Sequence, residues 1–292
     1  MPKKNIVNKF GGGILIKDFI PLMVERLREQ IKDGFEPVVV ISAFPGVTDK
    51  LLKSFDKSFL KKFKEENWQL MKDLKFDAKQ LKKTQIELNR LFTEMEKDLK
   101  LDRTIQAHQD RIAAYGEKLS ATIFTSYLNM SGLPAKRLLA EEIPIITDDN
   151  FTNANIIYKS SEKNIKQKIN NLKEIPIIPG FTGKTKNNKT TTLGRGGTDT
   201  TACFVGSALD AEKVILWKDV GGVFSADPKI VPKAKYLPVI SYREASMAGK
   251  IIHPKAIQYI KLTNTLLEIT FIANTKLKTK VGPIKKIKNY KT

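Results

Sequence analysis

Cysteine and histidine are nearly absent from this sequence of 292 residues, which has one cysteine and two histidines. The single cysteine, Cys203, cannot form a disulfide within the chain and fits a reducing compartment, so we expect a cytoplasmic protein. Because a structural zinc ion takes four cysteine or histidine ligands, so few of these residues argue against a zinc site. We interpret Cys203 as a small core residue of a helix rich in alanine and valine.

Long apolar runs and several familiar motifs are absent as well. No stretch approaches the ~20 apolar residues that a membrane-spanning helix needs, and residues 1–5 show no secretory signal. There is no internal repeat and no Gly-x-Ser-x-Gly elbow of a serine hydrolase. The glycines at 11–13 lack the spacing of a dinucleotide fingerprint. Gly183-Lys184-Thr185 resembles the end of a Walker loop, but Ile178 stands where the first glycine would be. We therefore expect no membrane, dehydrogenase or P-loop protein.

Acidic residues are outnumbered, at 31 against 51 lysines and arginines, and the formal net charge is +20. Such a balance favours an anionic partner, either a nucleic acid or a small molecule. The excess lysine is spread over the chain, and part of it lies from residue 276 onward, where no acid occurs. Nucleic-acid binding that weakens steeply with salt stays an alternative, but we expect no nucleic acid as the main partner.

The order of apolar runs predicts an α/β fold. Strands at 5–10 and 37–42, joined by glycines and a helix over 18–33, form a βαβ opening. Residues 49–131 are predicted almost wholly helical and are densely charged from 53 to 103. We interpret them as a solvated helical insertion, with a coiled-coil surface as the alternative.

Beyond residue 133 strands and helices alternate again. The patterns predict strands at 135–138, 143–147, 175–179, 213–217 and 267–273, a hairpin over 181–193, and helices over 160–171 and 200–209, from 241 and from 254. The whole is predicted to be a three-layer α/β/α sandwich with a mostly parallel central sheet and a helical insertion.

Residues 190–202 hold the strongest candidate site. A short strand ends at Gly194, Arg195 follows, and Gly196 and Gly197 precede a helix that begins near Asp199. A helix N-terminus presents unpaired N–H groups to an anion, and glycine lets the ligand approach closely. Arginine binds a carboxylate or phosphate through two parallel hydrogen bonds. An ordinary strand-to-helix turn is the alternative.

Four further stretches carry charge beside glycine or at the end of a strand. Lys9 precedes Gly11 and Gly12, a setting that suits nucleotide phosphates. Asp219 ends a strand before Gly221-Gly222 and is able to orient a lysine or hold Mg²⁺ through water. Lys250 stands before His253-Pro254, a predicted helix start, and Glu117 lies on a helix where it is able to bind an ammonium group. Each of these also fits a plain cap or a solvated surface residue.

Taken in order, these stretches resemble the aspartate kinases of the amino-acid kinase superfamily, over nearly the whole chain to about residue 282. The shared elements are Lys-Phe-Gly-Gly at 9–12, the strand 38–41 with Ser42-Ala43, Tyr-Gly-Glu at 115–117, Thr-Leu-Gly-Arg-Gly-Gly-Thr-Asp at 192–199, Trp-Lys-Asp at 217–219, 222–228, 241–245 and 250–254. The resemblance implies phosphorylation of the aspartate side-chain carboxylate by ATP carrying Mg²⁺.

The resemblance also implies roles for individual residues. Lys9 and Lys250 would contact the transferred phosphate, with Asp199 and Asp219 orienting the lysines and organising Mg²⁺, and no metal bound directly by the protein. Arg195 would hold a carboxylate of aspartate and Glu117 its ammonium group, with Ser42 and Thr48 helping to seat it. Nucleotide contacts would come from Lys9, Gly11, Gly12, Gly196, Gly197, Lys218, Asp219, Phe224, Lys229, Lys250 and Ile251.

The sequence departs from the family pattern at several positions. Gly13-Ile14 replaces the usual Thr-Ser, the link at 246–249 is short, Phe224 stands where tyrosine is common, and Lys229 stands where arginine is common. We expect one catalytic domain, with an aspartate lobe over 1–194, an ATP lobe over 195–282, a basic tail over 283–292 and no regulatory ACT domains. Two copies of the chain could form a homodimer. The alternatives are a kinase for another acid and an inactive module that binds a partner through its basic insertion.

Overall fold

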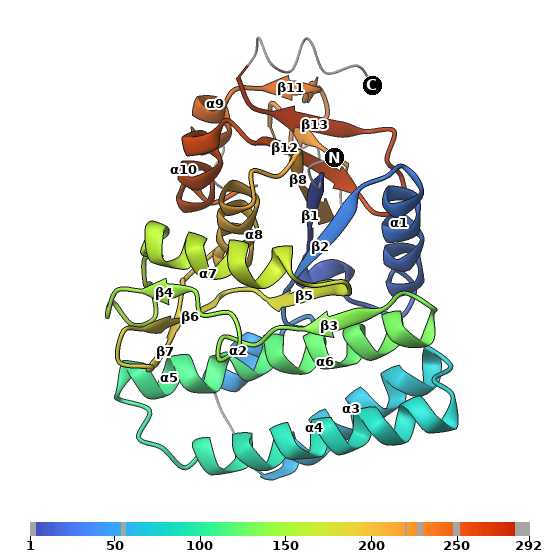
Figure 1. The fold of residues 1–292 in the computed structure, drawn as a ribbon, viewed down its shortest axis with the longest axis vertical. Helices are drawn as coiled ribbons and strands as arrows, with labels where there is room; N and C mark the ends of the chain where they lie inside the picture. Colours follow the sequence, from blue (N-terminus) through green and yellow to red (C-terminus); the bar gives the residue numbers. More distant parts are fainter. Residues whose placement is uncertain (1–3, 54–56, 220, 227–229, 248–251, 284–292) are drawn as a thin grey trace.

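The computed structural model describes residues 4–53, 57–219, 221–226, 230–247 and 252–283 (Figure 1). Its strands are β1 (Asn5–Phe10), β2 (Glu36–Ile41), β3 (Ala135–Arg137), β4 (Ile146–Thr147), β5 (Ile175–Pro179), β6 (Thr182–Thr185), β7 (Thr190–Thr192), β8 (Lys213–Lys218), β9 (Val223–Phe224), β10 (Tyr236–Leu237), β11 (Val239–Ile240), β12 (Leu266–Phe271) and β13 (Lys278–Val281). Its helices are α1 (Ile20–Lys32), α2 (Val47–Lys53), α3 (Lys57–Asp73), α4 (Ala78–Asp98), α5 (Gln106–Ala113), α6 (Tyr115–Met130), α7 (Tyr158–Asn170), α8 (Gly197–Ala208), α9 (Tyr242–Met247) and α10 (Pro254–Thr263), with a short 3-10 turn over Gly12–Ile14.

One sheet of eight strands organises the molecule, in the order β11-β13-β12-β8-β1-β2-β5-β3. Its strand pairs are parallel except for the antiparallel pair β12 and β13. The chain runs from β1 to β2 on one side and later places β8 on the other side of β1. In an open α/β sheet, ligands bind outside the carboxyl ends of the strands where the order reverses in this way.

Alternation along the buried strands decides which side chains face which helices. In β1, Ile6 and Phe10 belong to the core beneath α1 and α6, whereas Val7 belongs to the core beneath α7, α8 and α10. Lys9 shares the parity of Val7, so its ammonium group faces α8. Helices on both faces of a mostly parallel sheet confirm the predicted three-layer sandwich (Figure 1).

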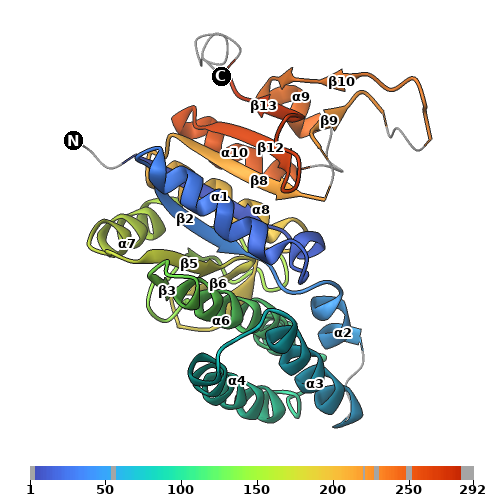
Figure 2. The same cartoon turned by 90° about the vertical axis from the view of Figure 1, so that its right-hand side faces the viewer.

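The helices between β2 and β3 build a third core. Side chains of α2, α3, α4, α5 and α6 pack around Phe63, Phe92 and Met95. Helix α6 belongs to two cores, because Leu119 and Ile123 face this helical cluster while Phe124 and Leu128 face the central sheet. Helices α3 and α4 lie at the end of the molecule away from β11 and β13 (Figures 1 and 2). Of the described helices, none is both long enough and apolar enough to span a bilayer.

Several local features differ from the sequence expectations. Helix α1 begins at Ile20 after Phe19, which makes no side-chain cap, so Asp18 is not its cap. Strands β9, β10 and β11 have two residues each and carry too little pattern for prediction. The four-residue strand β13 was missed as well. The hairpin over 181–193 is confirmed as β6 and β7, with Asn188 at a positive φ of 60° in its turn. The division into two lobes with a basic tail stays a prediction.

Candidate functional site

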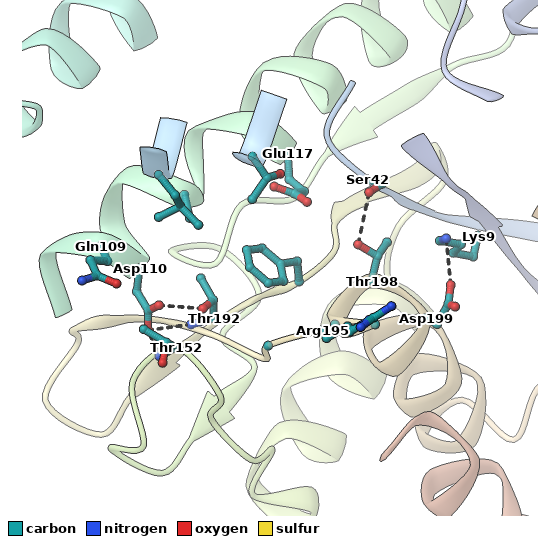
Figure 3. A pocket seen from close by; sticks show the side chains of 17 residues that line it. Lys9, Ser42, Gln109, Asp110, Glu117, Thr152, Thr192, Arg195, Thr198 and Asp199 are labelled. Carbon is teal, nitrogen blue, oxygen red and sulfur yellow. Dashed lines mark hydrogen bonds and ion pairs between the residues drawn. The ribbon is translucent and has the colours of Figure 1, made fainter. Parts of the chain in front are cut away.

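A cavity of about 450 Å³ opens beside the carboxyl ends of β1 and β2, next to the first turn of α8 (Figure 3). Its wall comes from five regions far apart in the sequence. The lining residues are Lys9, Ser42, Thr48, Leu52, Gln109, Asp110, Ala113, Glu117, Thr152, Phe181, Thr192, Gly194, Arg195, Gly196, Gly197, Thr198 and Asp199. Eight of the predicted site residues therefore meet here: Lys9, Ser42, Thr48, Glu117, Arg195, Gly196, Gly197 and Asp199.

A buried cluster of charges closes one end of this cavity. Lys9 Nζ lies 2.7 Å from Asp199 Oδ1, and Lys218 Nζ lies 3.1 Å from Asp199 Oδ2. Lys9 and Asp199 are only 7% and 6% exposed. Burial by itself raises the pKa of Asp199, but the two lysines outweigh it and hold the pKa below its usual value. Burial lowers the pKa of Lys9, although Asp199 opposes that shift. The cluster has more positive than negative charge and so suits an anion.

The glycine turn after β1 lies against the same cluster. A Cβ on Gly11 would stand 2.8 Å from Lys9 Nζ, and one on Gly12 would stand 3.0 Å from the carbonyl oxygen of Ala43. At Gly13 a Cβ would stand 3.3 Å from Asp219 Oδ2. Asp219 therefore lies beside the glycine turn, while Asp199 pairs with Lys9 and Lys218. Glycine at 11 and 12 allows the backbone to pass close to the lysine and to any phosphate that it binds.

The turn that joins β7 to α8 presents a helix N-terminus to the cavity. Gly194 and Gly196 have positive φ angles of 74° and 72°, which only glycine adopts at little cost. Gly196 is the N-cap of α8 and makes no side-chain cap. The first turn, Gly197 to Asp199, lines the cavity. The positive end of the α8 dipole thus adds to the field of the lysines.

Two ionisable side chains without an ion-pair partner among the described residues face the rest of the cavity. Arg195 is exposed at its rim, and within the described chain no acidic side chain forms an ion pair with it. Glu117 is 2% exposed, and its Oε2 has no hydrogen-bond partner among the described residues. Burial raises the pKa of Glu117 to about 8, against a hydrogen bond from the Ala43 backbone. A buried carboxylate without a partner is costly unless a ligand cation completes it.

Ser42 and its neighbours connect the Glu117 side of the cavity to α8. The Thr198 hydroxyl donates to Ser42 Oγ over 3.4 Å, and the Ser120 hydroxyl donates to the Ser42 carbonyl oxygen over 2.6 Å. Helix α6 passes close to this segment because residue 116 is glycine. A Cβ there would stand 2.8 Å from the Ala43 Cβ and 3.6 Å from Thr48 Oγ1. The position of Glu117 therefore depends on Gly116.

We expect Gly116→Ala to push α6 away from the segment that carries Ser42 and Thr48. Overpacking of this kind costs about 1–3 kcal/mol of unfolding free energy. Chemical denaturation measures that loss, and Thr125→Ala, farther along α6, is the control. A Gly116→Ala protein as stable as the parent would contradict the close approach.

Not every predicted nucleotide contact lines the cavity. Lys229, Lys250 and Ile251 fall outside the described residues, and Gly11, Gly12, Lys218 and Asp219 lie near the lysine cluster without lining it. Phe224 is in β9 and packs against Tyr236, with ring centroids 5.7 Å apart, and it does not line the cavity. The β9–β10 hairpin projects beside β13 and α9 (Figure 2). The nucleotide roles of Phe224, Lys229, Lys250 and Ile251 stay predictions.

The sequence interpretation missed Asp110. This aspartate of α5 is 1% exposed, lines the cavity, and lies near Thr152 and Thr192 at the end away from Lys9 (Figure 3). Phe181, at a positive φ of 66°, was missed as well. One signal for Asp110 was available. It precedes Glu117 by seven residues in a helical stretch, a spacing that places two side chains on one face.

Comparison with known proteins agrees with this geometry. A model of the amino acid kinase family matches residues 4–270. Similar curated proteins include the aspartokinase of Rickettsia prowazekii, 30% identical over 278 residues that cover 92% of this chain and 53% of the relative. Aspartokinase 1 of Bacillus subtilis is 32% identical over 267 residues, with 87% and 55% covered. The chain thus spans about half the length of the curated relatives it matches.

Solved structures share the fold. Escherichia coli aspartokinase III in complex with aspartate and ADP matches with a TM-score of 0.85 and 22% identity, covering 96% of this chain and 64% of that one. UMP kinase from Ureaplasma parvum matches with a TM-score of 0.56 and 18% identity, covering 97% and 100%. At such identities these likenesses establish the architecture, and they confirm the α/β/α sandwich predicted from the sequence.

Proposed function

Because the chain belongs to the amino acid kinase family, we propose that it is an aspartate kinase. It would transfer the γ-phosphoryl group of ATP to the side-chain carboxylate of L-aspartate and give 4-phospho-L-aspartate, the first step toward lysine, threonine and methionine. One observation carries this proposal. The buried Glu117, the exposed Arg195 and the Lys9–Asp199–Lys218 cluster surround one cavity and complement the three charges of aspartate.

Each charge of aspartate has a counterpart in the cavity. Arg195 would bind the α-carboxylate through parallel hydrogen bonds, and Glu117 would accept the ammonium group, which supplies the partner that Glu117 Oε2 lacks. Ser42 and Thr48 would seat the bound amino acid between them. The side-chain carboxylate is then directed to the end of the cavity where Lys9 and the first turn of α8 lie.

The phosphate end needs positioning and charge neutralisation more than acid–base chemistry. A side-chain carboxylate has a pKa of about 3.9 and is already ionised at neutral pH, so no base has to remove a proton. One of its oxygens attacks the γ-phosphorus, the bond to the β-phosphate oxygen breaks, and ADP leaves. Lys9, held by Asp199, and the α8 N-terminus would stabilise the charge on the transferred group.

Mg²⁺ would arrive with ATP. Among the described residues no group of three or more acidic, histidine or cysteine side chains is arranged to hold a metal ion. Mg²⁺ keeps several waters and is commonly held by substrate phosphates with one or two carboxylates. Asp219, exposed beside the glycine turn, would orient a water of the ion. The ion would neutralise part of the phosphate charge.

The proposal keeps the division into lobes, with an aspartate lobe over residues 1–194 and an ATP lobe over 195–282. Nucleotide contacts would come mainly from the second lobe, through Gly196, Gly197, Lys218, Asp219, Phe224, Lys229, Lys250 and Ile251, together with Lys9, Gly11 and Gly12 of the first. Aspartate and ATP would be the ligands of a cytoplasmic enzyme, and a homodimer is compatible with this account.

A panel of acceptors tests the substrate. With ATP and Mg²⁺, we expect ADP release with L-aspartate, and release with L-glutamate that is lower by about 10–200-fold, the range for one methylene in a pocket. N-acetyl-L-glutamate lacks the ammonium group that Glu117 needs and should be inactive. Turnover with glutamate or N-acetylglutamate but not aspartate would instead favour a kinase for another acid.

A further inference from the structure

The Asp110 carboxylate holds two backbone segments at the acceptor end of the cavity. Its Oδ2 accepts hydrogen bonds from the backbone N–H groups of Thr152 and Thr192, over 2.8 Å and 2.9 Å. Its Oδ1 accepts from the Thr192 hydroxyl over 2.6 Å. Burial raises the pKa of Asp110, with these hydrogen bonds opposing the shift. Asp110 belongs to α5 in the helical insertion, and Thr192 lies 82 residues farther along the chain.

The segment that contains Thr192 is an edge strand, β7. In the small sheet the order is β4-β6-β7, so β7 has a neighbour on one side, β6. The N–H of Thr192, the last residue of β7, donates to Asp110, while the Thr192 carbonyl oxygen accepts from the Ala154 N–H over 2.8 Å. Asp110 thus supplies the acceptor that a further strand would offer.

The segment that contains Thr152 is strained. Thr152 has a φ of 67°, a left-handed conformation that is unfavourable for a β-branched residue. Such conformations persist where surrounding contacts over-determine them. The bond from the Thr152 N–H to Asp110 is one such contact.

Both segments meet the turn that carries Arg195. A Cβ on Gly194 would stand 3.2 Å from the Thr152 carbonyl oxygen and 2.6 Å from Asn153 Oδ1, so the strained loop lies directly on Gly194. On the other side Gly194 follows Leu193, whose N–H donates to the Phe181 carbonyl oxygen over 2.8 Å. Arg195 is the next residue, and its backbone direction depends on where these neighbours hold Gly194.

We propose that Asp110 is a positioning residue for the acceptor: through Thr192 and Thr152 it fixes the turn that presents Arg195 to the substrate carboxylate. This inference rests on the proposed function, because it takes the bound acid to be aspartate. The helical insertion then has a part in substrate binding, since α5 carries the carboxylate that the turn requires. Asp110 acts on the substrate through Arg195.

A charged acceptor is essential to this role. An asparagine in place of Asp110 would be nearly the same size, but its amide group has one oxygen in place of two and would direct N–H donors at the donors of Thr152 and Thr192. The neighbouring Arg111 provides a matched control. It lies on the same helix and pairs with Asp98 of α4 through a contact of 2.6 Å, with no bond to either segment of the turn.

Steady-state kinetics provide the first test. For Asp110→Asn we expect the KM for aspartate to rise by about 10–100-fold, as for the loss of hydrogen bonds to a charged group. The KM for ATP should change by less than about twofold, because the lysine cluster lies at the other end of the cavity. Arg111→Gln should leave both KM values unchanged. Thr192→Val, which removes the hydroxyl bond alone, should raise the aspartate KM by a smaller factor and also serves if Asp110→Asn does not fold.

Amide hydrogen exchange gives a second test that needs no catalysis. In Asp110→Asn the peptide spanning residues 192–197 should exchange faster than in the parent, and in Arg111→Gln it should not. If the parent protein shows no aspartate-dependent turnover, the proposed function fails, while this exchange still decides the positioning role. An unchanged aspartate KM in Asp110→Asn, or unchanged exchange over 192–197 in that variant, would overturn the inference.

Discussion

Replacing Lys9 with methionine is expected to lower kcat for aspartate-dependent ADP release by about 10²-fold or more, the effect of losing a donor that faces transition-state charge. Methionine keeps the length and apolar stem of the side chain and removes the ammonium group. Lys218 would still hold Asp199 Oδ2, so we expect the fold to persist. Steady-state kinetics with saturating ATP and Mg²⁺ measure the effect.

The control for Lys9 is Lys4, an exposed lysine just before β1. Lys4→Met removes the same charge from the chain and should leave kcat within about twofold of the parent, because exposed charges a Debye length from the site are screened. A Lys9→Met protein that keeps the parent kcat would remove Lys9 from the chemistry. That result would favour the alternative of an inactive module, because binding a partner through the basic helical insertion does not require Lys9.

Replacing Glu117 with glutamine is expected to make the protein more stable at alkaline pH and a poorer binder of aspartate. In the folded chain burial raises the pKa of Glu117 to about 8, against an ordinary value of 4.5. The folded state therefore holds this proton more tightly than the unfolded state. The contribution of the protonated carboxyl to stability is full below pH 4.5 and is lost as the pH rises toward 8.

The stability of the two proteins should consequently diverge with pH. Near pH 4.5 the unfolding free energies of the parent and Glu117→Gln should lie close together. By about pH 8 the variant should be ahead by a margin on the order of 4 kcal/mol, because glutamine has no charge to bury. Urea denaturation at the two pH values measures this difference. A constant difference across this range would contradict the burial of an ionisable Glu117.

Binding should change in the opposite sense. An ammonium group needs the Glu117 carboxylate, so the apparent aspartate affinity of the parent should rise about fivefold between about pH 7 and 8, as the ionised fraction grows. In Glu117→Gln the aspartate KM should be about 10–100-fold higher and should lose this pH dependence. Titration of the nucleotide-bound protein with aspartate checks both. The same pH dependence in the variant would assign it to another group.

Local patterns in the sequence were sufficient to predict that Lys9 and the glycine turn at 194–197 belong to one site, and the structure brings both to one cavity. Lys9 ends an apolar strand before glycines, and the glycine turn at 194–197 precedes a helix, so the chain itself indicates two backbone anion sites. Alternation in β1 then directs Lys9 toward α8, where Asp199 lies in the first turn. The resemblance to aspartate kinases added Arg195 and Glu117 as predicted acceptor residues. The family match and the similar aspartokinases bear out the resemblance, and the two roles stay predictions.

Contacts between distant segments could not be predicted in this way. Asp110 is one charged residue in a densely charged helical region, and its role depends on Thr152 and Thr192, which only the folded chain brings near. In the same way, α6 was expected to belong to a solvated insertion, yet it also covers the central sheet through Phe124 and Leu128. Strand β13 was hidden by its lysines, although Thr279 and Val281 alternate with them and are fully buried.

The formation of an acyl phosphate tests the central claim most directly. The purified protein would be incubated with ATP, Mg²⁺ and L-aspartate in the presence of hydroxylamine, which converts an acyl phosphate into a stable hydroxamate. We predict aspartyl hydroxamate in a 1:1 ratio with the ADP released, and none when aspartate, ATP or Mg²⁺ is left out. ADP release without hydroxamate, or no ADP release with aspartate at any concentration, would contradict the account.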